Sequence, residues 1–391
     1  MDTDDFIVKR IPKAARPFVV IGAGIVLQAT YGIVYTFGNI LPYLVSYLRW
    51  KVDPNQTNGS MIWLQSLMNG IPFSMVLGGY LERKIGGRKG AIFGSIIYTG
   101  SMALSYFSIE HSYFLLLLTF GCMQSFGQGV SYNCILIQAQ RWMPHRVGLA
   151  SGLIVAGFGL GGFFISPLQT KYINPKNLPA GPDGFFTQRE ILEKVPSLFI
   201  LMAIVFGITQ LIALCFLAEP KNPDEIETQS LISMESTPDL SSRQIVYSST
   251  FKLLFATLFL NAIWCQTTSG FFKAYGMTFI HDDFFLAMIS SFAAMANCTS
   301  RVLWGLFVDK TSYQTSMMIA CTVGSALMWT LATIRWLEDR SFYFLWICGM
   351  FTCIGGTYTL VPYACHKSFG SYNFGIAYGL LQLSLVITDY F

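Results

Sequence analysis

Long hydrophobic segments separated by short polar turns occupy almost the whole chain. Each segment is long enough to cross the hydrocarbon core of a bilayer as one helix, which takes about 20 residues. The eleven predicted helices cover residues 18–46, 61–81, 90–108, 113–140, 147–168, 196–218, 252–276, 284–308, 315–334, 341–363 and 373–391. The pattern therefore predicts an all-α membrane protein.

Two polar regions interrupt the hydrophobic pattern. Residues 1–17 carry several basic side chains, and residues 219–251 are rich in Ser, Glu, Asp and Pro. Segments of this composition cannot bury enough apolar surface to fold by themselves. Six hydrophobic segments precede the second region and five follow it. The pattern therefore predicts a tail over 1–17, a first bundle over 18–218, a linker over 219–251 and a second bundle over 252–391.

Composition supports this class and narrows the chemistry. The chain is 53% hydrophobic and 12% charged, about half the charged fraction of a soluble domain. The net charge of +4 is spread over helix ends, so nucleic-acid binding has no support. The nine cysteines lie in apolar segments without a Cys-x-x-Cys pair, and no histidine lies mid-span, so neither a disulfide framework nor a metal site is predicted. No catalytic triad or phosphate-binding loop is present, so we expect no enzyme activity and no cofactor.

The basic residues predict how the chain crosses the membrane. They gather in the tail and in the turns after the second and fourth helices, and the positive-inside rule places these segments in the cytoplasm. The loop after the first helix then lies outside, and it carries glycosylation sequons at Asn55 and Asn58. The sequence therefore predicts a multi-pass glycoprotein of the plasma membrane or an organelle membrane, with a cytoplasmic N-terminus and linker.

One charged residue lies deep inside a predicted helix. Arg301 precedes Asp309 by eight positions, so it lies about 12 Å inside that end of the helix at 1.5 Å of rise per residue. A guanidinium at this depth is too costly to leave facing lipid, so it should face a cavity or a partner. No acidic residue lies mid-span to pair with it, and this makes Arg301 the leading candidate for a ligand of an anion.

A glycine followed four residues later by an acidic and a basic residue closes the second and the eighth helix. The two copies are Gly78 with Glu82 and Arg83, and Gly305 with Asp309 and Lys310. Duplicated bundles that meet at a midplane site are a common plan in transporters.

Two motifs carry a resemblance to a known family. Residues 78–89, Gly-Gly-Tyr-Leu-Glu-Arg-Lys-Ile-Gly-Gly-Arg-Lys, resemble the loop signature between helices two and three of the major facilitator superfamily. Residues 141–152, running on to the glycine-rich 157–162, are similar to the junction of helices four and five in the branch of monocarboxylate transporters and oxalate:formate antiporters. The resemblance covers nearly the whole chain. It implies a major facilitator fold of two six-helix bundles, the second incomplete because eleven spans are visible.

The resemblance also implies a role for the charged turns, which would latch the two bundles in one state of the transport cycle. Charge that only sets topology is the alternative. The candidate latch residues are Gly78, Gly79, Glu82, Arg83, Gly86, Arg88, Lys89, Gly305, Asp309 and Lys310. Because the eleventh helix ends at Phe391, we expect a shortened or partial form that transports weakly or not at all.

Several further residues are candidates for the substrate cavity. They are Gln28, Tyr31 and Tyr35 on the first helix, Lys273 near the outer end of the seventh, and Asn297, four residues before Arg301. Packing is the alternative for the aromatic residues, and a lysine that reaches to the membrane surface is the alternative for Lys273. Monocarboxylate transporters carry an acidic residue at the Asn297 position, so the resemblance does not extend to proton coupling through that residue.

These patterns together predict a transporter of small organic anions, with monocarboxylates favoured because one cation suits one carboxylate. The expected partners are the lipid bilayer and the anion, and a co-transported or exchanged ion is an open alternative. A membrane scaffold that does not transport, and a carrier of a neutral solute with Arg301 paired internally, are the alternatives.

Overall fold

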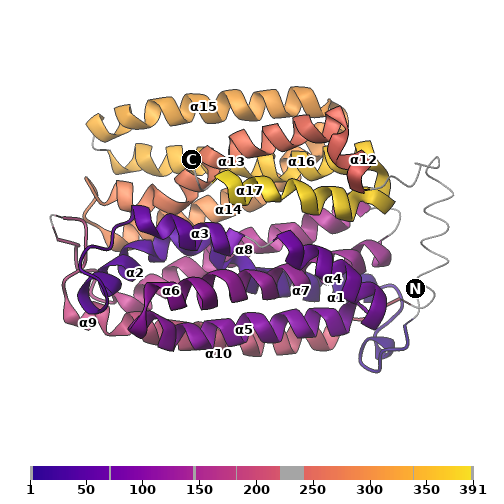
Figure 1. The fold of residues 1–391 in the computed structure, drawn as a ribbon, viewed down its shortest axis with the longest axis horizontal. Coiled ribbons are helices and arrows are strands. Elements are labelled where there is room, and N and C mark those ends of the chain that lie inside the picture. The colour runs from indigo at the N-terminus through magenta and orange to yellow at the C-terminus, as the bar shows by residue number, and fades with distance from the viewer. Residues whose placement is uncertain are drawn as a thin grey trace.

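The computed structural model describes residues 3–69, 72–143, 147–181, 183–220, 242–337 and 339–388 of the chain. These residues form helices and turns without any strand. Most of the long helices lie along the long axis of the molecule, with the first half of the chain below and the second half above in Figure 1.

The first half of the chain forms six helical passes that match the first six predicted helices. They are α1 (Arg16–Tyr31) with the 3-10 segment η2 (Gly32–Thr36) and α2 (Phe37–Lys51); α3 (Ile62–Asn69) with α4 (Pro72–Ile85); α5 (Gly87–His111); α6 (Tyr113–Leu116) with the π-helical η4 (Leu117–Met123) and α7 (Gln124–Trp142); α8 (Val147–Ile173); and α10 (Lys194–Phe216). Short helices η1 (Val8–Arg10), η3 (Gly59–Met61) and α9 (Arg189–Leu192) lie in the tail and the loops.

The second half contains the remaining long helices. They are α13 (Ser249–Gly276), α14 (Asp283–Lys310), α15 (Tyr313–Leu337) and α16 (Arg340–Leu381), with the short α12 (Ser242–Tyr247) before them and α17 (Leu383–Thr388) after them. The predicted linker spans 219–251, and its residues 221–241 lie outside the described part of the chain. Its last residues are helical in α12 and the start of α13.

The range assigned to α16 covers the predicted helix 341–363 and the first part of the predicted helix 373–391, which continues into α17. Arg340 lies 4.0 Å from Asp282, beside the start of α14, whereas the carbonyl of Leu385 accepts a hydrogen bond from Gln266, in the middle of α13. A straight helix of this length would span about 63 Å, far more than the distance between those two contacts allows. The chain therefore turns back on itself within α16. The predicted helix 341–363 corresponds to its first arm, and the described part of the predicted helix 373–391 corresponds to its second arm together with α17.

Glycines allow α8 to pack closely between the two halves of the molecule. A Cβ on Gly161 would overlap the carbonyl oxygen of Ala29 on α1, so only glycine fits this approach. On another face of α8, a Cβ on Gly159 would lie 2.6 Å from the Cβ of Cys298 on α14. The glycine-rich stretch thus sets the distance between the first bundle and the helix that carries Arg301.

The two ends of the molecule are defined by different loops. We call the end that carries the N-terminal residues and α12 the tail end, and the opposite end, which carries α9, the far end (Figure 1). At the tail end, Thr3 donates to the carbonyl of Glu219 and the Trp142 indole donates to the carbonyl of Ala218. These contacts hold the tail and the end of α10 against the first bundle.

Apolar side chains cover the outer faces of the long helices. On α10, for example, Ile204, Ile208 and Leu211 are exposed, as expected for a surface that contacts lipid. Seven of the described helical stretches are long and apolar enough to cross a membrane by length and composition alone. The helices α13 and α14 are not among them, because polar residues such as Gln266 and Asn297 lower their hydropathy.

Candidate functional site

A cavity of about 590 Å³ lies between the two halves of the chain. The first half contributes walls from η2, α4, α7 and α8, and the second half contributes walls from α13, α14, α16 and α17. Its polar lining consists of Tyr35, Gln128, Tyr132, Gln266, Ser269, Arg301, Asp309, Tyr358, Thr359, Tyr363, Tyr378 and Gln382. Along α14 the lining runs from Arg301 to Asp309, so the cavity extends from the middle of the molecule towards the tail end.

Arg301 lies in the wall of this cavity, as the sequence predicts. It is 5% exposed, and it forms no ion pair with any acidic residue in the described part of the chain. Of the described residues that line the cavity, it is the only basic one. A buried cation of this kind favours an anion that arrives from water.

Two of the candidate residues hold the Arg301 side chain in place. Its Nε donates to Asn297 Oδ1 at 3.0 Å, and one terminal nitrogen donates to the Tyr35 hydroxyl. Asn297 is itself held, since its amide nitrogen donates to the carbonyl of Phe351 at 3.0 Å. A guanidinium has five N–H donors, so these described contacts leave three on its terminal nitrogens for a ligand.

The other two candidates from the first helix do not line the cavity. The Tyr31 hydroxyl is 2.9 Å from Ser95 Oγ and donates to Ser131 Oγ at 2.7 Å, both within the first bundle. Gln28 is fully buried, and its side-chain amide has no hydrogen-bond partner among the described residues. Both residues pack inside the first bundle and do not belong to the described cavity lining, so a part for them in substrate binding stays a prediction.

Lys273 also departs from both interpretations of the sequence. It is fully buried, neither reaching the membrane surface nor lying at the mouth of the cavity. Its Nζ is 2.7 Å from Asp283 Oδ1 and donates to Asn39 Oδ1 at 3.0 Å. Asp283 begins its helix, a position that favours exposure at the membrane surface, whereas its side chain is 3% exposed, so the hydrophobic pattern gives no signal for this pairing.

Several cavity residues were not singled out from the sequence. Gln128 and Tyr132 on α7, and Gln266 on α13, line the cavity beside Arg301. Glutamine is rare inside a membrane-spanning segment unless it faces the protein interior, so its position in apolar helices was the available signal. The tyrosines gave no such signal, since aromatic side chains also pack in membrane helices.

The predicted latch residues of the second and third helices form contacts within the first half of the chain. Arg88 pairs with Asp5 in the tail, and its backbone N–H lies 3.3 Å from Glu219 Oε1. Gly86 has φ +89°, and a Cβ there would lie 2.6 Å from the same oxygen, so the turn requires glycine. These contacts join the turn to the tail and to the end of α10, not to the second bundle.

The remaining latch candidates divide between packing and the cavity. Gly78 approaches the carbonyl of Val130 on α7, and Gly79 approaches the Asn133 side chain. Gly305 and Asp309 line the cavity, while Lys89 and Lys310 contribute no described inter-bundle contact. The side chains of Glu82 and Arg83 lie outside the described ones, so their part in a latch stays a prediction.

The predicted glycosylation residues lie in the loop between α2 and η3 at the far end. Asn55 is exposed and Asn58 is half-buried, and their modification stays a prediction. Among the described residues there is no cluster of three His, Cys, Asp or Glu side chains that could hold a metal ion.

Comparisons with known proteins find relatives of similar sequence. The chain is 25% identical over 433 residues to the apicoplast pyruvate carrier 1 of Toxoplasma gondii, covering 92% of this chain and 79% of the carrier. It is 24% identical over 295 residues to the oxalate:formate antiporter of Oxalobacter formigenes, covering 75% of this chain and 64% of the antiporter.

The fold is similar to that of solved transporter structures. The xylose transporter XylE from E. coli, in a partially occluded inward open conformation, matches with a TM-score of 0.67 and 12% sequence identity, covering 96% of this chain and 90% of XylE. The family model of the Major Facilitator Superfamily matches residues 8–387. This multi-pass membrane protein therefore belongs to the Major Facilitator Superfamily of transporters.

Proposed function

We propose that the chain transports small monocarboxylates and that Arg301 binds the carboxylate group. The observation that carries this proposal is a buried guanidinium in the cavity wall. Three of its N–H donors bond to no described residue, and it has no described acidic partner. Two relatives, a pyruvate carrier and an oxalate:formate antiporter, support a small carboxylate as substrate.

The contacts of Arg301 favour a bidentate interaction. Because Asn297 occupies the Nε donor, the side of the guanidinium that carries both terminal nitrogens remains for two parallel hydrogen bonds to one carboxylate. Tyr35 holds one of these nitrogens from the first bundle and also places its ring centroid 5.6 Å from the guanidinium carbon. The substrate would therefore bind where the two bundles meet.

The charges around the cavity favour one carboxylate over two. Lys273 is paired with Asp283 and does not line the cavity, so a dianion would find one cation, Arg301, among the described lining residues. Asp309 lines the tail-end part of the cavity and would repel a second negative charge. Formate, pyruvate and lactate should therefore bind more tightly than oxalate.

A ligand panel tests this proposal on the purified protein. The melting temperature is measured with increasing pyruvate, lactate, formate, oxalate and glucose at constant ionic strength, since a ligand that binds the folded state stabilises it. We expect saturable stabilisation by the three monocarboxylates and a weaker effect of oxalate. Uptake of labelled pyruvate into proteoliposomes then distinguishes transport from binding alone.

Each other outcome of the panel contradicts the proposal in a specific way. Stabilisation by glucose but by no carboxylate would indicate a neutral-solute carrier. Tighter binding of oxalate than of formate would refute the preference for a single carboxylate. An absence of stabilisation by any of the five compounds would favour a membrane scaffold.

A further inference from the structure

A buried ion pair closes the far end of the molecule. Lys273 lies near the end of α13 and Asp283 begins α14, so both belong to the second bundle. The lysine side chain is fully buried and the aspartate side chain is 3% exposed, with 2.7 Å between Nζ and Oδ1. Asp283 is the only buried acidic residue among the described side chains.

Side chains of the first bundle bind this pair directly. Tyr43 on α2 donates its hydroxyl hydrogen to Asp283, and Asn174, just after α8, donates to Asp283 Oδ2 at 2.8 Å. Asn39 accepts from Lys273 and is fixed by its own bond to the carbonyl of Ser166 at 3.1 Å. The ion pair is thus internal to one bundle, while its hydrogen bonds cross to the other.

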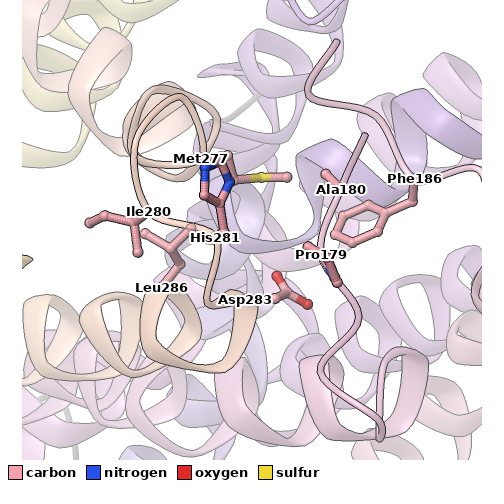
Figure 2. A pocket seen from close by; sticks show the side chains of 8 residues that line it. All are labelled: Pro179, Ala180, Phe186, Met277, Ile280, His281, Asp283 and Leu286. Carbon is pink, nitrogen blue, oxygen red and sulfur yellow. The ribbon is translucent and has the colours of Figure 1, made fainter. Parts of the chain in front are cut away.

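The surroundings of Asp283 leave almost no space for a solute to pass. Figure 2 shows its carboxylate facing the loop with Pro179, Ala180 and Phe186 from the first bundle, with the Met277 to Leu286 segment on the other side. The space between them is about 10 Å³, room for about one water. The Phe186 ring also stacks on Tyr43 with 4.8 Å between centroids.

The position of the pair is opposite to the open part of the cavity. At 1.5 Å of rise per residue, Arg301 lies about 27 Å further along α14 than Asp283. Along α14, the cavity lining extends from Arg301 in the other direction, to Asp309. Between the pair and Arg301, Ser166 Oγ lies 2.8 Å from Ser290 Oγ across the bundles, and both serines are buried. The molecule is therefore closed between the cavity and the far end.

We propose that Lys273 and Asp283 form the far-end gate of the transporter, and that Asn39, Tyr43 and Asn174 are its partners on the first bundle. When the far end opens, the bonds from the pair to the first bundle break and water replaces them, while the ion pair itself stays within the second bundle. Opening therefore leaves neither charge of the pair without its partner, and a buried charge without a partner would be strongly destabilising. The gate rests on the transporter fold and its central cavity, not on the identity of the substrate.

Tyr43→Phe tests the gate, because it removes one hydroxyl that bonds across the bundles and leaves the ion pair intact. Tyr343→Phe is a matched control. Tyr343 is equally buried at the far end, but its hydroxyl donates to the carbonyl of Phe272 within the second bundle. Both variants lose one buried hydroxyl, so a general loss of stability affects them alike.

The readout is the accessibility of a cysteine introduced by Ser166→Cys, placed between the gate and Arg301. The purified protein is treated with a charged thiol reagent, and modification of the peptide with residue 166 is followed by mass spectrometry, which separates it from the native cysteines. We expect Tyr43→Phe to raise the labelling rate several-fold and Tyr343→Phe to leave it near that of the Ser166→Cys protein.

Equal labelling rates in Tyr43→Phe and Tyr343→Phe would overturn the gate. The measurement needs no substrate, so its result is independent of carboxylate binding. If Tyr43→Phe accelerates labelling while no carboxylate stabilises the protein, the gate holds and the proposed substrate class fails. If pyruvate binds but the two variants label alike, the substrate class holds and the gate fails.

Discussion

Replacement of Arg301 is the most direct perturbation of the proposed binding site. Arg301→Gln removes the positive charge and both terminal nitrogens that would face the carboxylate. Hydrogen bonds to charged groups contribute about 1.5–3 kcal/mol each, so the loss of two corresponds to about 3–6 kcal/mol. Because about 1.4 kcal/mol is a factor of ten in Kd, the affinity for pyruvate should fall by about two to four orders of magnitude.

Arg301→Lys separates the charge from the geometry of the side chain. An ammonium keeps the positive charge but presents a single nitrogen, so it cannot form the two parallel bonds of a guanidinium. One of the two bonds should be lost, which corresponds to about 1.5–3 kcal/mol and an affinity about 10- to 100-fold weaker. The lysine variant should therefore bind pyruvate with an affinity between those of the wild type and Arg301→Gln.

The assay is a pyruvate titration of the purified proteins at constant ionic strength, followed by calorimetry or by melting temperature. Arg335→Gln is the control, since it is the same substitution at an exposed position on α15, outside the cavity. Removing a buried cation without an acidic partner also removes its desolvation cost. The ligand-free Arg301→Gln protein should therefore melt at or near the wild-type temperature, which separates lost binding from misfolding. A wild-type Kd in Arg301→Gln would refute the role of this residue.

Three further predictions concern the surroundings of the site. Arg88→Ala should lower the maximal rate of pyruvate uptake at unchanged Kd, because it breaks the ion pair with Asp5 that holds the turn to the tail, away from the cavity; a change in Kd alone would contradict this. Gly161→Ala should destabilise the protein by about 1–3 kcal/mol, because the added methyl group overlaps the backbone of α1. The control is Gly152→Ala, where the added Cβ would meet open space, and it should leave the melting temperature nearly unchanged. Asn297→Asp should weaken pyruvate binding at least about tenfold, measured by titration, because a carboxylate 3.0 Å from Arg301 Nε competes for the same cation.

The number and order of the helices could be predicted from the sequence because the signal is local. A hydrophobic segment long enough to cross the bilayer forms a helix whatever it packs against, since its backbone groups must be bonded internally. The same argument predicted that Arg301 faces the protein interior, because lipid cannot solvate a guanidinium. The reversal inside α16 was also anticipated as the turn between two predicted helices.

The roles of Tyr31 and Tyr35 could not be separated by their spacing. Four residues apart on a regular helix, they would share one face, which is why both were expected to line the cavity. In the structure the 3-10 segment η2 begins between them, and Tyr35 bonds to Arg301 while Tyr31 bonds to Ser95 and Ser131. The change of helical geometry and the position of the partner helices decide which face each ring takes.

Lys273 shows most clearly what only the tertiary structure decided. By sequence it lies near the end of a membrane helix, where a lysine can reach water, and Asp283 lies at the start of the next helix. Whether such residues are solvated or buried depends on what covers them, and here Asn39, Tyr43 and Asn174 from the first bundle do so. Each of these partners is more than a hundred residues away along the chain from the residue to which it bonds. The sequence by itself determined the helices and the buried arginine, because bilayer solvation acts on each segment separately. The cavity and the closed far end depend on how the two bundles meet, which no single segment encodes.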